Sequence, residues 1–230
     1  MNYTITESTA FPIVEIALQQ GENITIDSGS MVYHNGKVSL SGKINSNGKS
    51  GITGILSALG RSVSSGEGFW ETEVTGSTNE AKISLAPDTP GTIKTLSLSG
   101  TSWYLNTGAF LASDKTVSYT MKRQKVSGAV FGGTGGLYVM ETTGTGDLLI
   151  NSYGDIIELD ITDDTPMVID NEHVVAWSSS LDYNIKIASG LLGFKTGEGL
   201  VNEFHGTGKV LIQTRKIKSL VESLSPLSDD

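Results

Sequence analysis

The side chains best suited to acid–base or metal chemistry in this sequence are its three histidines, His34, His173 and His205. A metal site needs several imidazole, thiolate or carboxylate ligands that converge on one ion, and the chain contains no cysteine. Only His173 has a carboxylate close by in a suitable context, because Asp170 precedes it by three residues and could orient the imidazole. The alternative is a turn at Asp170-Asn171 with the ring bonded to a backbone carbonyl. We expect no metal and no cofactor.

Two glutamates offer a second possible acid–base pair. Glu67 and Glu198 each stand between two glycines, and two carboxylates about 5–10 Å apart can act as acid and base. The corresponding position of a third, similar segment is Thr134, and a Gly-Glu-Gly turn needs only its glycines for positive φ. The glycine-rich run 131–136 is followed by a strand pattern instead of the helix that a phosphate-binding loop requires. No catalytic residue and no nucleotide site are therefore predicted.

The overall composition narrows the classes of partner. The chain has 16 Lys+Arg and 25 Asp+Glu among its 230 residues, a formal net charge of −9. Such an acidic chain is poorly suited to displace counterions from nucleic acid or to bind anionic lipid electrostatically. No apolar run reaches the roughly 18 residues of a membrane span, and the start lacks a secretory signal pattern. We predict a cytoplasmic protein with no nucleic-acid partner and no transmembrane segment.

The elements that must position these residues are short strands. Apolar residues alternate with polar ones in short runs bounded by glycine, asparagine, aspartate, serine or proline, which is typical of half-buried strands joined by tight turns. The runs are Val14/Ile16/Leu18, Ile24/Ile26, Ile83/Leu85, Leu96/Leu98, Val117/Tyr119/Met121, Ile157/Leu159/Ile161, Ile185/Ile187 and Val210/Ile212. Only Ile52–Leu59 and Ile217–Leu224 have helical spacing. The fold class predicted is all-β, a sandwich or a barrel-like fold, with a short C-terminal helix.

An ordered set of motifs occurs three times along the chain. Each copy has a glycine hairpin, an acidic residue, a small turn and a closing strand, and a second apolar element also recurs. The hairpin glycines are Gly68, Gly136 and Gly199, the acidic residues are Glu73, Glu141 and Glu203, the closing strands are 82–85, 148–150 and 210–212, and the second element is 29–33, 108–112 and 172–176. We predict a single triplicated domain with pseudo-threefold symmetry, made of units 11–88, 89–152 and 153–215 and a tail, 216–230. The hairpin glycines should have positive φ or leave no room for a Cβ.

These motifs carry a resemblance to a known family. The segment Ile169–Trp177, the hairpin 197–201 and the ending Gly206–Arg215 resemble the family of the altered inheritance of mitochondria protein twenty-four, as do shorter pieces within 29–133. The resemblance covers residues 11–215. It implies a triplicated β fold similar to the subunit of the tryptophan RNA-binding attenuation protein, a TRAP-like, prism-like arrangement of the double-stranded β-helix type. It implies no catalytic residues, and its mitochondrial members are tied to organisation of the inner membrane.

Three apolar, glycine-flanked segments occupy equivalent places in the three units: Ile52–Leu59, Gly128–Phe131 and Gly190–Phe194. We favour burial in the fold or in a homo-oligomer interface over membrane contact. The candidate interface residues are Ile55, Leu56, Leu191, Leu192 and Phe194. The function predicted is that of a non-enzymatic interaction or scaffold module that self-assembles. The alternatives are a membrane-associated organiser, as the resemblance implies, and a small-molecule or metal-dependent enzyme with a site near His173.

Overall fold

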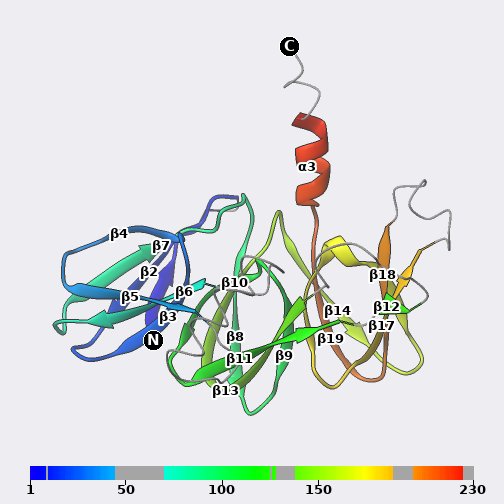
Figure 1. Cartoon of the computed structure of the whole chain (residues 1–230), viewed down its shortest axis with the longest axis horizontal. Coiled ribbons are helices and arrows are strands. Elements are labelled where there is room, and N and C mark those ends of the chain that lie inside the picture. The colour runs from blue at the N-terminus through cyan, green and yellow to red at the C-terminus, as the bar shows by residue number, and fades with distance from the viewer. Residues whose placement is uncertain (9, 45–69, 125, 128–137, 189–198, 225–230) are drawn as a thin grey trace.

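The computed structural model describes residues 1–8, 10–44, 70–124, 126–127, 138–188 and 199–224. These residues form an all-β fold with one short α-helix near the C-terminus, as predicted (Figure 1). Their strands lie in one eleven-stranded sheet and two four-stranded sheets. The barrel-like alternative is wrong for this part of the chain, because the large sheet ends at β14 and at β5 instead of closing on itself.

The strands of the first third of the chain are β1 (Asn2–Ile5), β2 (Val14–Leu18), β3 (Asn23–Asp27), β4 (Met31–His34), β5 (Val38–Ile44), β6 (Trp70–Gly76) and β7 (Ala81–Leu85). The middle third forms β8 (Ile93–Ser99), β9 (Trp103–Asn106), β10 (Phe110–Asp114), β11 (Val117–Arg123), β12 (Val126–Ser127) and the long β13 (Tyr138–Asn151). The last third forms β14 (Ile156–Ile161), β15 (Met167–Asp170), the 3-10 turn η1 (Asn171–His173), β16 (Val174–Ser178), β17 (Asp182–Ile187), β18 (Leu200–His205), β19 (Gly208–Gln213) and the helix α3 (Ile217–Leu224).

Every predicted alternating run lies in a strand, and α3 covers the predicted C-terminal helix. In β2 the alternation corresponds directly to burial, because Val14, Ile16 and Leu18 are fully buried and the residues between them are not. Ile157 differs, with 45% exposure, because β14 is the end strand of the large sheet and has only β19 beside it. The predicted helix Ile52–Leu59 lies outside the described residues.

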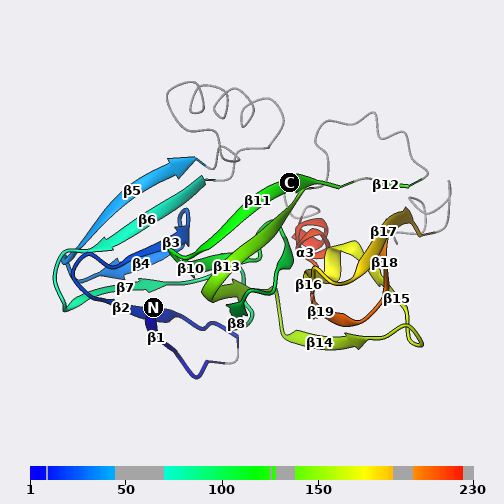
Figure 2. The same ribbon diagram turned by 90° about the horizontal axis from the view of Figure 1, so that it is seen from below.

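The sheets have defined strand orders. The first four-stranded sheet has the order β1-β2-β7-β4, and the other has the order β12-β17-β18-β15. The large sheet has the order β14-β19-β16-β9-β13-β10-β3-β6-β5, and both β8 and β11 also pair with β13. Figures 1 and 2 show the strands of the first, middle and last thirds of the chain as three neighbouring groups. The large sheet runs through all three groups.

The strands β4, β10 and β16 contain the same irregularity. Each pairs with the strand that closes its third of the chain, and each pairing shifts register by one residue at a β-bulge. The shift falls between Met31 and Tyr33 in β4, between Phe110 and Ala112 in β10, and between Val174 and Ala176 in β16. A bulge adds one unpaired residue, which bends and twists the strand. These strands are the apolar element that recurs in the sequence.

Beyond their bulges, β10 and β16 also pair with strands from the preceding third of the chain. Ala112 of β10 lies opposite Ile26 of β3, and Ala176 of β16 lies opposite Leu105 of β9. The bulge residues pack into the preceding hydrophobic core, because Leu111 joins the core of β2, β3 and β7, while Val175 joins the core that contains Leu105. These two junctions connect the three groups of strands through shared sheet and shared core.

Candidate functional site

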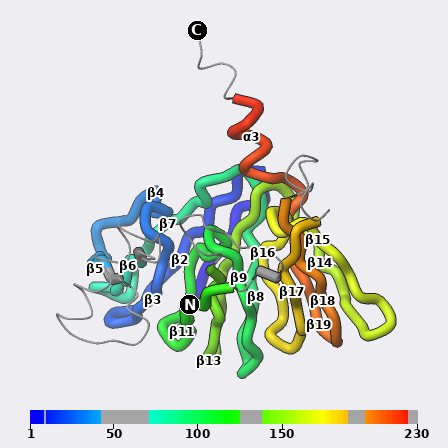
Figure 3. The backbone as a smooth tube through the Cα atoms, turned by 45° about the vertical axis from the view of Figure 1, so that its right-hand side comes forward, coloured from blue at the N-terminus to red at the C-terminus, as the bar shows by residue number. Residues whose placement is uncertain are grey.

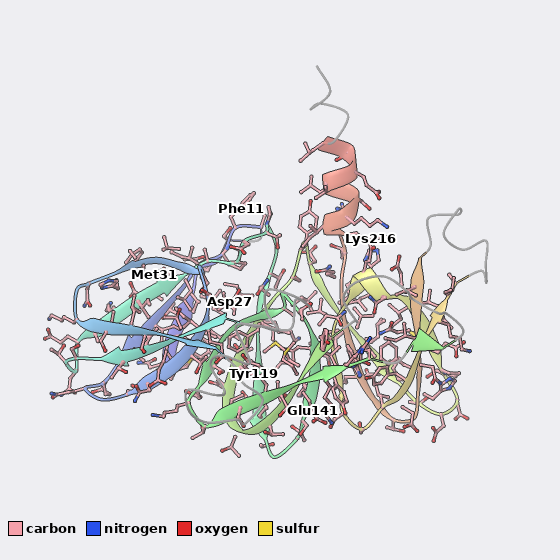
Figure 4. All side chains as sticks on the ribbon, in the orientation of Figure 1. Phe11, Asp27, Met31, Tyr119, Glu141 and Lys216 are labelled. Carbon is pink, nitrogen blue, oxygen red and sulfur yellow. The ribbon has the colours of Figure 1, made fainter. Side chains whose placement is uncertain are left out.

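Asp170 and His173, the polar pair singled out in the sequence, lie at the two ends of the turn between β15 and β16. The Asp170 carboxylate accepts a hydrogen bond from the backbone N–H of Glu172 at 2.9 Å and pairs with Lys216 Nζ at 2.5 Å. The His173 Nδ1 lies 2.6 Å from the carbonyl oxygen of Gln213. Each side chain therefore has its own structural partner, in the arrangement expected of a turn that anchors the imidazole to the backbone. Lys216 lies at the base of α3 (Figure 4).

The histidines do not converge. His34 is in β4, where its Nδ1 accepts a hydrogen bond from the backbone N–H of Gly36 at 3.0 Å, whereas His205 ends β18. Within the described ranges, no group of three or more histidine, cysteine, aspartate or glutamate side chains is placed to hold a metal ion. The described part of the chain thus offers no residue set to which a metal could be assigned.

Most residues of the predicted hairpins and of the predicted interface lie outside the described residues. These are Gly68, Gly136, Glu67, Glu198, Ile55, Leu56, Leu191, Leu192 and Phe194. Gly199, which directly precedes β18, has φ of +50° and no atom within 4 Å of the place that a Cβ would take. A larger residue at position 199 would therefore be strained by the backbone conformation and not by crowding.

Glu141 and Glu203, two of the recurring glutamates, have cross-strand lysine partners. Glu141 on β13 lies 2.6 Å from Lys122 Nζ on β11 and accepts a hydrogen bond from the Tyr104 hydroxyl at 2.9 Å. The hydrogen bond from Lys122 holds the pKa of Glu141 below its ordinary value, while burial and the neighbouring Glu141 raise the pKa of Tyr104. At neutral pH this site therefore contains a carboxylate, an ammonium and a protonated phenol, a charge-balanced structural cluster. Glu203 on β18 pairs in the same way with Lys186 on β17 at 2.5 Å.

An aromatic cluster lies beside this polar cluster. Trp177 is fully buried on β16, and its ring centroid lies 5.6 Å from that of Tyr104, 5.0 Å from that of Tyr183 and 5.7 Å from that of Phe204. Tyr104 and Trp177 come from the paired strands β9 and β16, and Tyr183 and Phe204 come from the paired strands β17 and β18. The sequence patterns did not identify this cluster, because its members are scattered over a hundred residues and meet only through strand pairing.

Among the described strands, β4 and β15 carry the most exposed large apolar side chains. On β4, Met31 is 40% exposed, Val32 52% and Tyr33 46%, and on β15 Val168 is 64% exposed. Among the described residues, β4 pairs only with β7 and β15 pairs only with β18. Unpaired backbone beside exposed apolar side chains is a site for pairing with another strand. The two edges are therefore the candidate functional surface.

Comparison with known proteins identifies the family. Residues 3–215 match the family model described as mitochondrial biogenesis AIM24. This chain belongs to the AIM24 family. The family resemblance seen in the sequence motifs is thus confirmed.

Two relatives of this AIM24-family chain come from Streptococcus pyogenes. It is 44% identical, over 225 residues, to an uncharacterised protein of the serotype M6 strain, and the match covers 97% of this chain and 90% of that protein. It also matches a crystal structure determined as a structural genomics target with a TM-score of 0.81 and 40% identity, covering 98% of this chain and 99% of the other. Neither description assigns an activity. Among the described residues of the AIM24-family chain, no helix has the length and apolar character needed to cross a membrane.

Proposed function

We propose that this AIM24-family protein is a non-enzymatic module that self-assembles and acts as a scaffold or interaction surface. We further propose that it consists of three equivalent β units, 11–88, 89–152 and 153–215, in a pseudo-threefold, TRAP-like arrangement. The single observation that carries self-assembly is the pair of unpaired, apolar strand edges at β4 and β15. The acidic, cysteine-free composition favours a cytoplasmic location.

The three-unit arrangement is supported by strand register. The recurring bulges of β4, β10 and β16 occupy the same place in each unit. In each unit a lysine also lies opposite the residue that precedes the recurring glutamate by two positions. The lysine pairs are Lys43 with Glu71, Lys122 with Val139 and Lys186 with Val201, and the glutamates are Glu73, Glu141 and Glu203. Such agreement in register is expected of copies of one unit.

The non-enzymatic role is supported by how the reactive side chains are used. Asp170, His173 and Glu141 each hold a structural partner at hydrogen-bond distance, and Glu141 on β13 is separate from the turn that carries the other two. The enzyme alternative requires such groups to converge on a substrate instead. The exposed edges of β4 and β15, by comparison, have no neighbouring strand among the described residues.

Measuring the mass of the purified protein in solution tests self-assembly. Light scattering coupled to size exclusion should give a mass above the 24.3 kDa of one chain at micromolar concentration. A single species of one-chain mass at high micromolar concentration would overturn the proposal. Elemental analysis of the same sample that returned about one zinc per chain would instead favour the enzyme alternative near His173.

A second candidate function is contact with a membrane surface, which the position of α3 favours. The helix projects from the sheets (Figures 1 and 3) and exposes Ile217 by 49%, Leu220 by 39% and Leu224 by 52% on its apolar face. An exposed amphipathic helix can bury such a face in the interfacial region of a bilayer. Flotation with vesicles should then recover the protein, and Leu220→Glu should abolish recovery. Recovery of neither protein would exclude this candidate.

A further inference from the structure

We infer that β15 of one copy of this chain pairs antiparallel with β4 of a second copy, so that copies join head to tail. This inference rests on the proposed self-assembly and identifies its surface, partner and register. The argument uses two junctions that the chain already contains.

The first observation is that both internal junctions have one geometry. In the β3–β10 junction, Ala112 lies opposite Ile26 and Ser113 lies opposite Thr25. In the β9–β16 junction, Ala176 lies opposite Leu105 and Trp177 lies opposite Tyr104. Both pairings are antiparallel, and both start at the residue that follows the bulge.

The second observation concerns two sets of equivalent strands: β4, β10 and β16 form one set, and β3, β9 and β15 form the other. Of these six strands, only β4 and β15 take no part in the two internal junctions. Like β10 and β16, β4 has a bulge against its closing strand, and Tyr33 is the residue after it. Like β3 and β9, β15 pairs with the strand that carries a recurring glutamate: the residues opposite Glu73, Glu141 and Glu203 are Thr25, Tyr104 and Val168. Val168 therefore corresponds to Thr25 and Tyr104, and Ile169 corresponds to Ile26 and Leu105.

This equivalence determines the register of the proposed contact. If the third junction follows the first two, Tyr33 lies opposite Ile169, His34 opposite Val168 and Asn35 opposite Met167. One chain cannot make this contact with itself, because β4 and β15 lie toward opposite ends of the molecule (Figures 2 and 3). The partner strand must come from another copy.

Other described strands also end sheets. Strands β5 and β11 each have a single partner, β6 and β13, whereas β17, which carries the equivalent lysine, pairs with the two-residue β12 as well as with β18. Strands β14 and β8 likewise have one partner each, β19 and β13, whereas β2 pairs with both β1 and β7. By contrast, β10, β16, β3 and β9 are paired on both edges. Among the described strands of these two sets, β4 and β15 therefore lack a neighbour that their equivalents have.

The third observation is the bulge residue itself. Leu111 is 1% exposed and Val175 is 2% exposed, because each packs into the core of the preceding group of strands. Val32 holds the same place in β4 and is 52% exposed. Its counterpart core is the cluster that contains Trp177 and Phe204 behind β15. In the proposed contact, Val32 of the second copy would pack against this cluster.

Neither edge carries the side chains that commonly block strand pairing, and the bulge of β4 also occurs in β10 and β16, which pair on both edges. Edge strands are commonly blocked by lysine, by proline within the strand or by inward-pointing charge. The β4 sequence is Met-Val-Tyr-His, and the β15 sequence is Met-Val-Ile-Asp. Asp170 ends β15 and is already paired with Lys216.

Two variants that each block one edge test the proposal. Val32→Asp places a carboxylate at the bulge of β4, and Val168→Asp places one on β15; both positions are more than half exposed in the single chain. Each variant alone should elute at one-chain mass, with a circular dichroism spectrum like that of the unmodified chain and a cooperative thermal unfolding transition. An equimolar mixture should form a two-chain complex, because each variant retains the edge that the other lacks. Ile157→Asp, on the edge strand β14 outside the proposed contact, is the matched control and should retain the unmodified mass.

The outcomes separate this inference from the proposed function. An unmodified chain of one-chain mass would refute self-assembly altogether. Assembly that survives both Val32→Asp and Val168→Asp would leave self-assembly standing and overturn the β4–β15 pairing. Assembly lost only in Val32→Asp would indicate a symmetric β4–β4 contact and would also overturn the head-to-tail pairing.

The register has a test of its own. His34 and Val168 are predicted to lie directly opposite each other, and opposite charges in such cross-strand positions attract. Adding His34→Lys to Val168→Asp in one chain should restore assembly, at least partly, with an affinity that weakens as salt is raised. Moving the lysine to position 31 should not restore it. Equal restoration by both would contradict the register.

Discussion

The bulges of β16 and β4 have the same backbone form and the same residue type in different surroundings. Val175 in β16 is 2% exposed in the core of the preceding strands, whereas Val32 in β4 is 52% exposed. The residues two positions after these valines show the same contrast in burial: Trp177 is fully buried, and His34 is exposed. The contrast shows that the bulged strand is a connecting element, and that its burial depends on whether a preceding group of strands is present.

The largest effect is expected at Trp177. Replacement by alanine removes three ring contacts and a fully buried side chain, and should lower the free energy of unfolding by about 3–5 kcal/mol. His34→Ala, at the corresponding place in β4, should change it by less than about 0.5 kcal/mol when measured in the Val168→Asp background, where the chain is held dissociated. Urea unfolding monitored by circular dichroism measures both. Equal losses would show that the two strands are not in contrasting surroundings.

A matched pair of substitutions at the bulges should give the next largest effect. Val175→Ala removes two methyl groups from a packed core and should cost about 2 kcal/mol. Val32→Ala should cost less than about 0.5 kcal/mol when measured in the Val168→Asp background, where the chain is held dissociated. Without that background, Val32→Ala should instead weaken assembly. A cost of 2 kcal/mol for Val32→Ala in the dissociated chain would contradict the comparison.

Asp27 and Asn106 allow the two internal junctions to be compared. Asn106 Nδ2 donates to the carbonyl oxygen of Val174 at 2.6 Å, and Asp27 occupies the corresponding register position in β3. Burial raises the pKa of Asp27 to about 6, and the nearby Asp88 acts in the same direction. The folded state therefore favours the protonated acid, so this group costs stability as the pH rises from about 4 to above 6.

Asp27→Asn gives the first junction the same amide as the second. It should raise the free energy of unfolding by about 1–2 kcal/mol at pH 7.5, allowing for partial solvent screening, and by little at pH 4. Unfolding curves at the two pH values test this expectation. A gain that is equal at both pH values, or a loss at pH 7.5, would show that ionisation of Asp27 is not the cause.

The smallest effect is expected at the cross-strand ion pairs. The pKa of Glu141 is lowered by its hydrogen bond with Lys122, so the pair stabilises the fold above the ordinary carboxylate pKa and loses this effect as the pH falls below it. Glu141→Gln should cost about 0.2–1 kcal/mol at pH 7, and less in high salt, because Lys122 is half exposed. Glu203→Gln should behave alike if the two units are equivalent. Opposite signs for the two variants would argue against equivalence.

Local sequence patterns were enough to predict many of the strands, the C-terminal helix and the family. Alternation of apolar residues depends only on which face of a strand is buried, so segments such as Val14–Leu18 could be identified without any knowledge of their partners. The helix Ile217–Leu224 was found from its spacing in the same way. For Asp170 and His173 the residue types allowed either a carboxylate-oriented imidazole or a turn with the imidazole bonded to a backbone carbonyl, and the structure contains the turn. The glutamates of the repeated motifs could be identified from the sequence. Their lysine partners could not, because each pair joins two strands that are separated in sequence.

The tertiary structure alone decided which strands meet and which remain exposed. The repeated element 29–33 is as apolar as its counterparts 108–112 and 172–176, so nothing local distinguishes an exposed β4 from a buried β10 or β16. The difference arises because β10 and β16 follow a group of strands with which they can pair, whereas β4 belongs to the first group. Strand pairing is non-local, and a strand's sequence specifies the face that it can bury but not whether a partner will be there to bury it.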